Sequence, residues 1–341
     1  MPRAKIQDVA RLAGVSLSTV SAVLNNKEVV RAATRLRVLE AIARLHYRPD
    51  HFARNLARRS MRVIGVIVSN LQNPFFAETA QVIEDEAERL GYAVSLAATN
   101  FSPQRLRASV QQMLGARISG LAIMTSERDE MAFDIVAQSG VRSVYLDVGK
   151  PGPVSTNIRV DLRGGMMAAV KHLIDIGHRD LLFIRSAPIH SGPLLLSHRS
   201  RDRGFAAAVR ASGISNLQTH VIDVAGSGAP AGEEAISLAL GRFPFTAVIA
   251  VSDIVALGVY HGLQQRGVRI PQEVSVVGFD NTYFSRFLNP PLTTVDIPRD
   301  RLSRLVLEAL TLPPLSRGPA SVKLGTNLVV RASTASPALT S

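Results

Sequence analysis

IQDVARLAGVSLSTVSAVLN, residues 6–25, decides the fold of the N-terminal region. Apolar residues recur in it at every third or fourth position, which predicts two short helices in succession. Between the two helices, Gly14 permits a turn conformation that is costly for other residues. Within the first helix, the small Ala10 lets the second helix approach closely. Val20 is placed to pack the second helix on the first, and the hydroxyl of Ser16 is suited to cap its start. The spacing predicts a helix-turn-helix, although an ordinary helical hairpin can share the pattern.

The positive charge of the chain is concentrated around this motif. The 341 residues include 39 Lys and Arg and 27 Asp and Glu, a net charge of +12. Residues 1–62 hold 13 of the basic and four of the acidic side chains, a local balance of +9, so the rest of the chain is nearly neutral. A basic stretch is often only a solvated face. On a segment with its own helical pattern, it favours binding to nucleic acid phosphates.

A third helical pattern follows the motif, and the character of the sequence then changes. Apolar residues keep helical spacing over 36–45, whereas DHFARNLARRS at 50–60 is short, basic and only weakly periodic. We therefore expect a DNA-binding domain at 1–48 and a hinge helix or linker at 49–61.

From Met61 onwards, short β-rich runs alternate with helical patterns. This alternation is typical of parallel sheets with crossover helices, because parallel strands cannot be joined by hairpins. The runs are too many for one compact sheet, and a division near residue 160 gives two similar lobes. We expect a body at 62–331, with lobe one at 62–160 plus 292–320, lobe two at 161–290 plus 321–331, and a disordered tail at 332–341.

Composition and missing motifs exclude several classes of protein. There is no cysteine, which excludes disulfides, thiolate zinc sites and cysteine nucleophiles. No apolar run has the roughly 18 residues of a membrane span, and the basic start lacks the apolar segment of a secretory signal, so we expect a cytoplasmic protein without membrane contact. GxxxxGK[ST] and GxSxG are absent, and no histidine has a carboxylate partner at metal-ligand spacing. We expect no enzyme, no metal and no cofactor.

Taken together, the motifs resemble the lac-repressor (LacI/GalR) family of bacterial transcription regulators over nearly the whole chain. The resemblance implies an α/β fold: a three-helix head with a helix-turn-helix, a hinge, and a two-lobed body of doubly wound parallel sheets like that of periplasmic binding proteins. It also implies a sequence-specific transcriptional regulator, in the first instance a repressor, controlled by a small effector bound between the lobes. The motifs that carry it are the stretch quoted first, TRLRVLEAIARLHYRPDHFARNLA at 34–57, IGVIVSNLQNPFF at 64–76, HLIDIGHRDLLFI at 172–184, RDRGF at 201–205, VSVVGFDN at 274–281 and NPPLTTVDI at 289–297.

The resemblance implies two sets of DNA contacts. The second helix would lie in the major groove, and the hinge helix would enter the minor groove, where Leu56 matches the leucine that wedges between base pairs. The alternative for Leu56 is a linker leucine that docks on the body. Phosphate contacts by arginines of the hinge would position the protein without reading sequence. The predicted contacts are Ser16, Leu17, Ser18, Thr19, Ser21, Ala22, Asn25, Arg54, Asn55, Leu56 and Arg58.

Three departures from the family pattern affect the head. Lys5 stands where relatives often have a threonine that caps the first helix, so a capping oxygen is lost there. Ala22 stands where relatives often have an arginine, so a bidentate contact to guanine is missing there and the operator need not resemble a familiar one. Arg31 stands where relatives often have a serine before the third helix, so that helix loses a capping oxygen.

The resemblance also implies an effector site. Ligands of doubly wound sheets sit beyond the carboxyl ends of the strands. Asp147 and Asp280 each close a predicted strand, and Arg201 comes early in a predicted helix. Two carboxylates and one guanidinium suit a polyol, because carboxylates accept from neighbouring hydroxyls and Arg donates in a fork. The predicted effector contacts are Phe75, Phe76, Met124, Asp147, Arg201, Ser252 and Asp280.

Some of these residues have structural alternatives. Phe75 and Phe76 can stack on a sugar ring or simply line the first lobe. Asp280 can cap a following helix, and for Asp253 the capping role is the preferred interpretation.

The expected partners are an operator duplex, an effector and a second copy of the chain. A single head covers only one half-site, so we expect a homodimer on a pseudo-palindromic operator. The expected effector is a sugar or sugar derivative, and a purine is less expected because little stacking surface is present. The alternative from another class is a sugar-binding or sugar-converting protein whose basic head serves only localisation or solubility.

Overall fold

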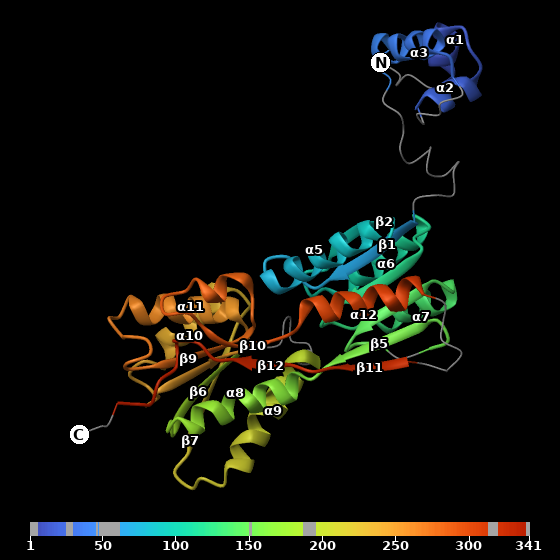
Figure 1. Ribbon diagram of the computed structural model, residues 1–341. Coiled ribbons are helices and arrows are strands. Elements are labelled where there is room, and N and C mark those ends of the chain that lie inside the picture. The colour runs from blue at the N-terminus through green and yellow to red at the C-terminus, as the bar shows by residue number, and fades with distance from the viewer. Residues whose placement is uncertain are drawn as a thin grey trace. The chain divides into compact units, whose positions relative to one another are not determined.

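The computed structural model describes residues 6–24, 30–45, 47, 62–149, 152–186, 196–312 and 320–338 (Figure 1). The chain divides into two compact units, Met1–Met61 and Arg62–Ser341, which we call the head and the body. The predicted hinge at 49–61, with Arg54, Asn55, Leu56 and Arg58, lies outside the described residues, and so does Asn25.

The described residues of the head form three helices, α1 (Ile6–Ala13), α2 (Leu17–Leu24) and α3 (Ala32–Arg44). Between α1 and α2, Gly14 has a φ of +63°, the left-handed conformation that glycine adopts at little cost. The Ser16 Oγ accepts a hydrogen bond of 3.2 Å from the Thr19 N–H and so caps α2. Val20 is fully buried against the other two helices. The helix-turn-helix is therefore confirmed.

The third helix begins without a cap from a side chain. Arg31 occupies the N-cap position and makes no capping hydrogen bond. This agrees with the loss of a capping oxygen that the sequence predicts. The cost of such a loss is typically about 1 kcal/mol.

The body consists of two lobes, each built on a six-stranded sheet in the part of the chain that the structure describes. The described pairs of strands are parallel except β10 with β12, as the alternation of runs and helices predicts. In lobe one the order is β11 (Ala320–Leu324), β5 (Ser155–Val160), β4 (Arg142–Leu146), β3 (Gly120–Met124), β1 (Arg62–Val68) and β2 (Tyr92–Ala98). In lobe two it is β12 (Asn327–Val329), β10 (Thr293–Asp296), β9 (Ser275–Asp280), β8 (Ala247–Ala250), β6 (Asp180–Ser186) and β7 (Gln218–Val224).

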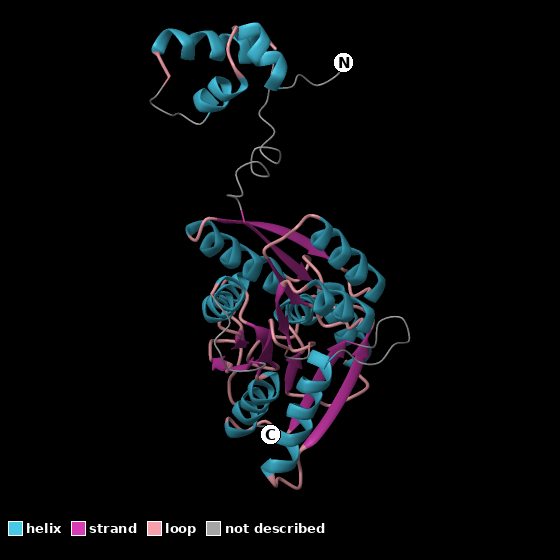
Figure 2. Cartoon of the chain, turned by 90° about the vertical axis from the view of Figure 1, so that its right-hand side faces the viewer, coloured by secondary structure: helices cyan, strands magenta, loops and turns pink. Residues whose placement is uncertain are grey.

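Helices cover both faces of each sheet (Figure 2). In β1, Ile64 and Val66 face a different part of the core from Ile67, because successive side chains of a strand point to opposite faces. In β6, Leu182 and Phe183 alternate in the same way. None of the helices that the structure describes is both long and apolar enough to cross a bilayer. The helices of lobe one are α5 (Pro74–Arg89), α6 (Pro103–Gly115), α7 (Glu130–Ser139) and α12 (Arg299–Thr311), and those of lobe two are α8 (Leu162–Asp175), α9 (Leu196–Ser212), α10 (Ala229–Ala239), α11 (Asp253–Gln264) and the 3-10 helix η2 (Tyr283–Arg286).

The chain crosses between the lobes after β5, after β10 and between β11 and β12. Two expected boundaries are wrong. The sequence predicts 292–320 in lobe one, but β10 at the start of this range pairs with β9 in lobe two. It predicts 321–331 in lobe two, but residues up to Leu324 belong to β11, which pairs with β5 in lobe one. The sequence hides the pairing of β11, because ASVKL is a short alternating run whose partner β5 lies far away in the sequence.

The predicted disorder of 332–341 is wrong for the described residues 332–338. Ser333 is fully buried, and its hydroxyl donates to the Val276 carbonyl at 2.6 Å and accepts from the Thr293 N–H at 2.7 Å. The Ala335 carbonyl lies 2.9 Å from Nε2 of the buried His178. This segment is therefore a packed part of lobe two.

Candidate functional site

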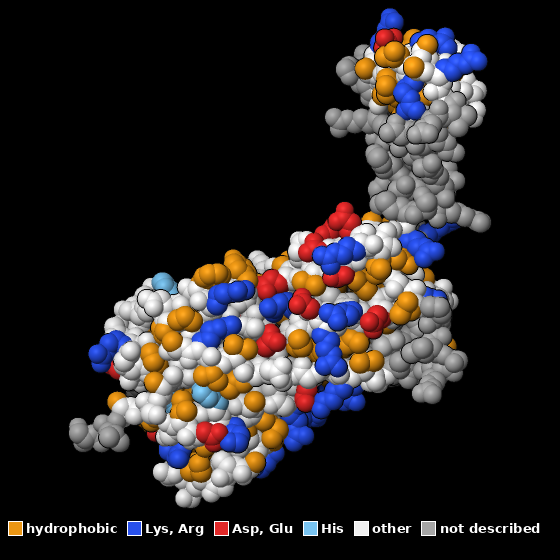
Figure 3. Space-filling model, viewed as in Figure 1, with side chains coloured by type: hydrophobic (Ala, Val, Ile, Leu, Met, Phe, Trp, Pro, Cys, Tyr) orange, Lys and Arg blue, Asp and Glu red, His pale blue; other side chains and the backbone are white. Residues whose placement is uncertain are grey.

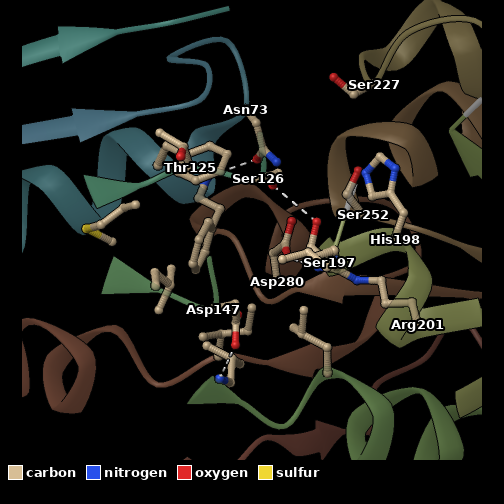
Figure 4. A pocket seen from close by; sticks show the side chains of 18 of the residues that line it. Asn73, Thr125, Ser126, Asp147, Ser197, His198, Arg201, Ser227, Ser252 and Asp280 are labelled. Carbon is tan, nitrogen blue, oxygen red and sulfur yellow. Dashed lines mark hydrogen bonds and ion pairs between the residues drawn. The ribbon is translucent and has the colours of Figure 1, made fainter. Parts of the chain in front are cut away.

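A pocket lies between the two lobes at the carboxyl ends of the strands (Figure 4). Met124 ends β3, Asp147 follows β4 and Asp280 ends β9. The space between the lining residues, including the part open to solvent, is about 770 Å³. All seven residues predicted to contact an effector line this pocket: Phe75, Phe76, Met124, Asp147, Arg201, Ser252 and Asp280. Their role in binding stays a prediction.

The wall contributed by lobe one is mainly apolar. Phe75 and Phe76 lie in the first turn of helix α5. The Asn73 side chain caps this helix by accepting a hydrogen bond from the Phe75 N–H at 3.0 Å. The two rings meet edge to face, with centroids 5.3 Å apart. Met124 is almost completely buried beside them in the core cluster. This wall presents aromatic and thioether surface to the pocket.

One carboxylate of lobe one interrupts this apolar wall. Asp147 lies just beyond β4 with a φ of +64°, an uncommon conformation for a residue with a side chain. Its Oδ1 accepts from the Val160 N–H at 2.9 Å. Burial disfavours the charged form and raises the pKa of Asp147 to about 6, although this hydrogen bond and the charge of Arg201 oppose the shift.

Lobe two contributes a buried ion pair. The Arg201 Nη2 donates to the Asp280 Oδ1 at 3.1 Å, and the exposed fractions of the two residues are 7% and 2%. The guanidinium also lies over the ring of Phe279, 4.2 Å from its centroid. Burial raises the pKa of Asp280 to about 6 against the opposing charge of Arg201, and it lowers the pKa of Arg201. The Arg201 Nε is buried without a partner among the described residues, so a donor remains available beside the pocket.

The structure corrects the alternative roles of two aspartates. Asp280 does not cap a helix, since its carboxylate pairs with Arg201 and the N-cap of η2 is Thr282. Asp253 does not cap α11 either, because the cap is Ser252, whose Oγ accepts from the Val255 N–H at 3.4 Å. Asp253 instead accepts from the N–H and hydroxyl of Thr282 and from the hydroxyl of Thr294, and burial raises its pKa to about 7.

Several pocket residues were missing from the predicted set. Asn73 and Ser126 line it from lobe one, and Ser197 and His198 line it from lobe two. The Ser197 hydroxyl donates to the Ser126 hydroxyl at 3.1 Å, across the gap between the lobes. His198 is buried, and burial lowers its pKa to about 4, so its imidazole is neutral at physiological pH. His198 lies three residues before Arg201 on α9, and this helical spacing is the signal that could have identified it.

The head presents the start of α2 to solvent. Ser16, Leu17 and Ser18 are exposed, and the Ser16 hydroxyl lies 2.7 Å from that of Ser18 and 2.9 Å from that of Thr19. Thr19, Ser21 and Ala22 are half-buried. The structure thus allows exposed polar contacts at the start of this helix, while the assignment of these residues to DNA stays a prediction.

The surface of the body differs in charge from the head. On the face shown in Figure 3, Lys and Arg side chains are interspersed with Asp and Glu. This mixture corresponds to the nearly balanced charge of the body sequence. Among the described residues, no group of three or more His, Asp and Glu side chains could hold a metal ion.

Comparison with known proteins gives matches for both units. The sequence matches the family described as bacterial regulatory proteins, lacI family, over residues 5–50, and a periplasmic binding protein-like domain over residues 170–334. The HTH-type transcriptional repressor PurR of Photobacterium profundum is 33% identical over 308 residues, which cover 90% of this chain and 91% of that protein.

Solved structures show the same similarity. A Lac repressor dimer bound to operator and the anti-inducer ONPF has a TM-score of 0.75 at 28% identity, with 98% of this chain and 100% of that chain covered. A regulator from Enterococcus faecium with bound ribose has a TM-score of 0.70 at 25% identity, covering 81% of this chain and 99% of that one.

Proposed function

This chain belongs to the LacI family of bacterial regulatory proteins, and we propose that the small molecule controlling it is a sugar. The chain is a DNA-binding transcriptional repressor controlled by a small-molecule effector, and it is not an enzyme. The observation that carries the sugar proposal is the division of the pocket between an aromatic wall in lobe one and a buried Arg201–Asp280 pair in lobe two.

The chemistry of the pocket supports this class of ligand. A sugar has hydroxyl groups around its edge and apolar C–H groups on its ring faces. Hydroxyls would donate to Asp147 and Asp280, and Arg201 would donate to a ring or hydroxyl oxygen. Phe75 and Phe76 would cover a ring face. The ribose-bound relative from Enterococcus faecium is consistent with this class of effector.

We also propose that the regulator acts as a homodimer on a pseudo-palindromic operator in the cytoplasm. One helix-turn-helix head reads only one half-site, so two heads related by a two-fold axis read a palindrome. The similar Lac repressor structure is a dimer bound to its operator. A repressor of transcription works where the chromosome is, which places it in the cytoplasm.

The operator proposal can be tested by selecting duplexes from a random pool with the full-length chain. We expect a motif with two-fold symmetry. The variant Leu56→Ala should bind the selected duplex about tenfold more weakly, because the proposed wedge helps to kink the duplex. Leu238→Ala, at an exposed leucine of α10, serves as the control. A selection that yields no symmetric motif would contradict the proposal.

The sugar proposal can be tested by thermal unfolding with a panel of pentoses, hexoses, sugar acids and purine bases. A molecule that binds only the folded chain raises the unfolding temperature. We expect a rise with one or more sugars that disappears in Arg201→Met but persists in Arg185→Met. Arg185 is a matched control on lobe two, since its partners Asp202 and Asp223 do not line the pocket. A response to purine bases and to no sugar would overturn the proposal.

A further inference from the structure

A charged cluster outside the pocket lining connects the two lobes. Glu78 lies on α5 in lobe one, and Arg299 is the first residue of α12, just after the chain has crossed from lobe two. The Glu78 Oε1 accepts from the Tyr283 N–H of lobe two at 2.9 Å. Its Oε2 lies 3.3 Å from the Arg299 Nε. One carboxylate of lobe one therefore binds a backbone group of the other lobe and an arginine at the crossover.

The same arginine holds the backbone that carries Asp280. The Arg299 Nη1 donates to the Asp280 carbonyl at 2.8 Å, and its Nη2 donates to the Asn281 carbonyl at 2.6 Å. Asp280 and Asn281 have φ values of +105° and +51°, so two consecutive residues with side chains lie in the left-handed region. Such conformations cost energy and persist only where surrounding contacts fix them. Arg299 supplies two such contacts.

The environment of this ion pair makes it different from an ordinary surface pair. The exposed fractions of the Arg299 and Glu78 side chains are 17% and 21%. On α5 itself, Glu86 pairs with Arg89 with exposed fractions of 46% and 69%. Shielding from water strengthens the attraction between charges, whereas exposed pairs contribute little. Glu86 thus offers a matched control on the same helix.

We propose that Glu78 and Arg299, through their contacts with the backbone of residues 280–283 in lobe two, form an interlobe latch that positions Asp280. The latch stabilises the arrangement of the two lobes described here, which we call closed. Neither residue lines the pocket, so both act through Asp280 and through the lobe equilibrium. An effector can shift that equilibrium only by its different affinity for the two arrangements. The latch sets the starting point of the equilibrium. The link between the latch and effector binding rests on the proposed contact of Asp280 with the effector. The effect of the latch on the arrangement of the lobes does not depend on that contact.

The latch can be tested without any ligand by hydrogen–deuterium exchange of the full-length chain. The segments that report on closure are 124–127 in lobe one and 196–198 in lobe two, where Ser126 and Ser197 meet across the gap. The second segment stops before Arg201, because Arg201 itself contacts Asp280. In Glu78→Ala and Arg299→Ala, we expect exchange to rise severalfold at 280–284 and also in these two segments. Glu86→Ala should leave all three segments unchanged.

A second variant separates charge from hydrogen bonding and keeps the test informative if the alanine variants fold poorly. Glu78→Gln preserves an oxygen that can accept from the Tyr283 N–H but removes the attraction to Arg299. We expect it to raise exchange in segments 124–127 and 196–198 by less than Glu78→Ala does. An increase confined to 280–284, no increase at all, or an equal increase in Glu86→Ala would overturn the latch. Because no ligand is added, failure of the sugar proposal would not change this result.

Discussion

The two lobes share a sheet topology but present different chemistry to the pocket. Each sheet adds its strands in an equivalent order, and each receives a strand from the C-terminal part of the chain at one edge. Lobe one contributes Phe75, Phe76 and a single carboxylate, Asp147. Lobe two contributes the buried pair of Arg201 and Asp280. In the proposed site the ligand lies between the lobes, and the side chains at the strand ends would decide which lobe contacts which part of it.

The two carboxylates make this difference measurable. Burial raises the pKa of Asp147 and of Asp280 to about 6. Asp280 has a direct ion-pair partner at 3.1 Å, whereas Asp147 receives a backbone hydrogen bond and the more distant charges of Arg201 and Arg159. Removing a charge should therefore have opposite effects on stability in the two lobes.

The largest expected effect is in lobe two. Arg201→Met removes the partner of Asp280 and leaves a buried carboxylate unpaired, which should lower the free energy of unfolding by about 3–5 kcal/mol. Urea unfolding of the full-length chain at pH 7.5 would measure it. Arg185→Met is the control, because its partners Asp202 and Asp223 are 19% and 46% exposed, so their loss of a partner should cost less than that of the buried Asp280. Equal losses in both variants would show that the pocket pair has no special role in stability.

The second effect has the opposite sign and lies in lobe one. Asp147→Asn should raise the free energy of unfolding by about 2–3 kcal/mol at pH 7.5, because the charged carboxylate is buried at a cost. The pKa of Asp147 is about 6 in the folded chain and near 4 in the unfolded chain. Between pH 4 and pH 6 the folded chain therefore binds more protons at Asp147 than the unfolded chain does. The stability of the chain falls as the pH rises through this range. The advantage of the variant should shrink below pH 6 and vanish near pH 4.

A second aspartate of lobe one provides the contrast. Asp129 caps α7 by accepting from the Ala132 N–H and forms an ion pair with Arg107, whose hydrogen bonds lower its pKa. Asp129→Asn should therefore destabilise the chain at pH 7.5, while Asp147→Asn stabilises it. Stabilisation by both variants, or by neither, would mean that burial is not the cause of the shift at Asp147.

Prediction from sequence succeeds where one local signal is sufficient. GLAIM at 120–124 is a contiguous apolar run and forms β3 with these bounds, and Gly14 has the positive φ that its turn requires. Asp147 and Asp280 could be placed in the pocket because each follows an apolar strand. STNIRV at 155–160 and ASVKL at 320–324 form no contiguous apolar run. ASVKL alternates apolar and polar residues, but its partner STNIRV lies far away in the sequence, so no local signal shows that the two strands pair.

The same limit applies to polar contacts between distant segments. Asp253 looks like a helix cap in sequence, but its partners Thr282 and Thr294 come from elements 29 and 41 residues further on. The Glu78–Arg299 pair joins residues more than 200 positions apart, and no spacing rule relates them. Small polar residues such as Ser333 are typical of a flexible tail in sequence. The sequence does not show the buried groups that they bind, because these groups come from distant segments of the chain.

The smallest expected effect concerns this C-terminal segment, which stabilises lobe two alone. Ser333→Ala leaves the buried Thr293 N–H and Val276 carbonyl without their hydroxyl partner, which should lower the free energy of unfolding by about 1–2 kcal/mol. Urea unfolding at pH 7.5 would measure the change. Ser336→Ala is the control, because Ser336 is exposed in the same segment and its replacement should cost under about 0.5 kcal/mol. If the two variants lose the same stability, residues 332–338 act as a surface tail, and the difference between the lobes is confined to the pocket.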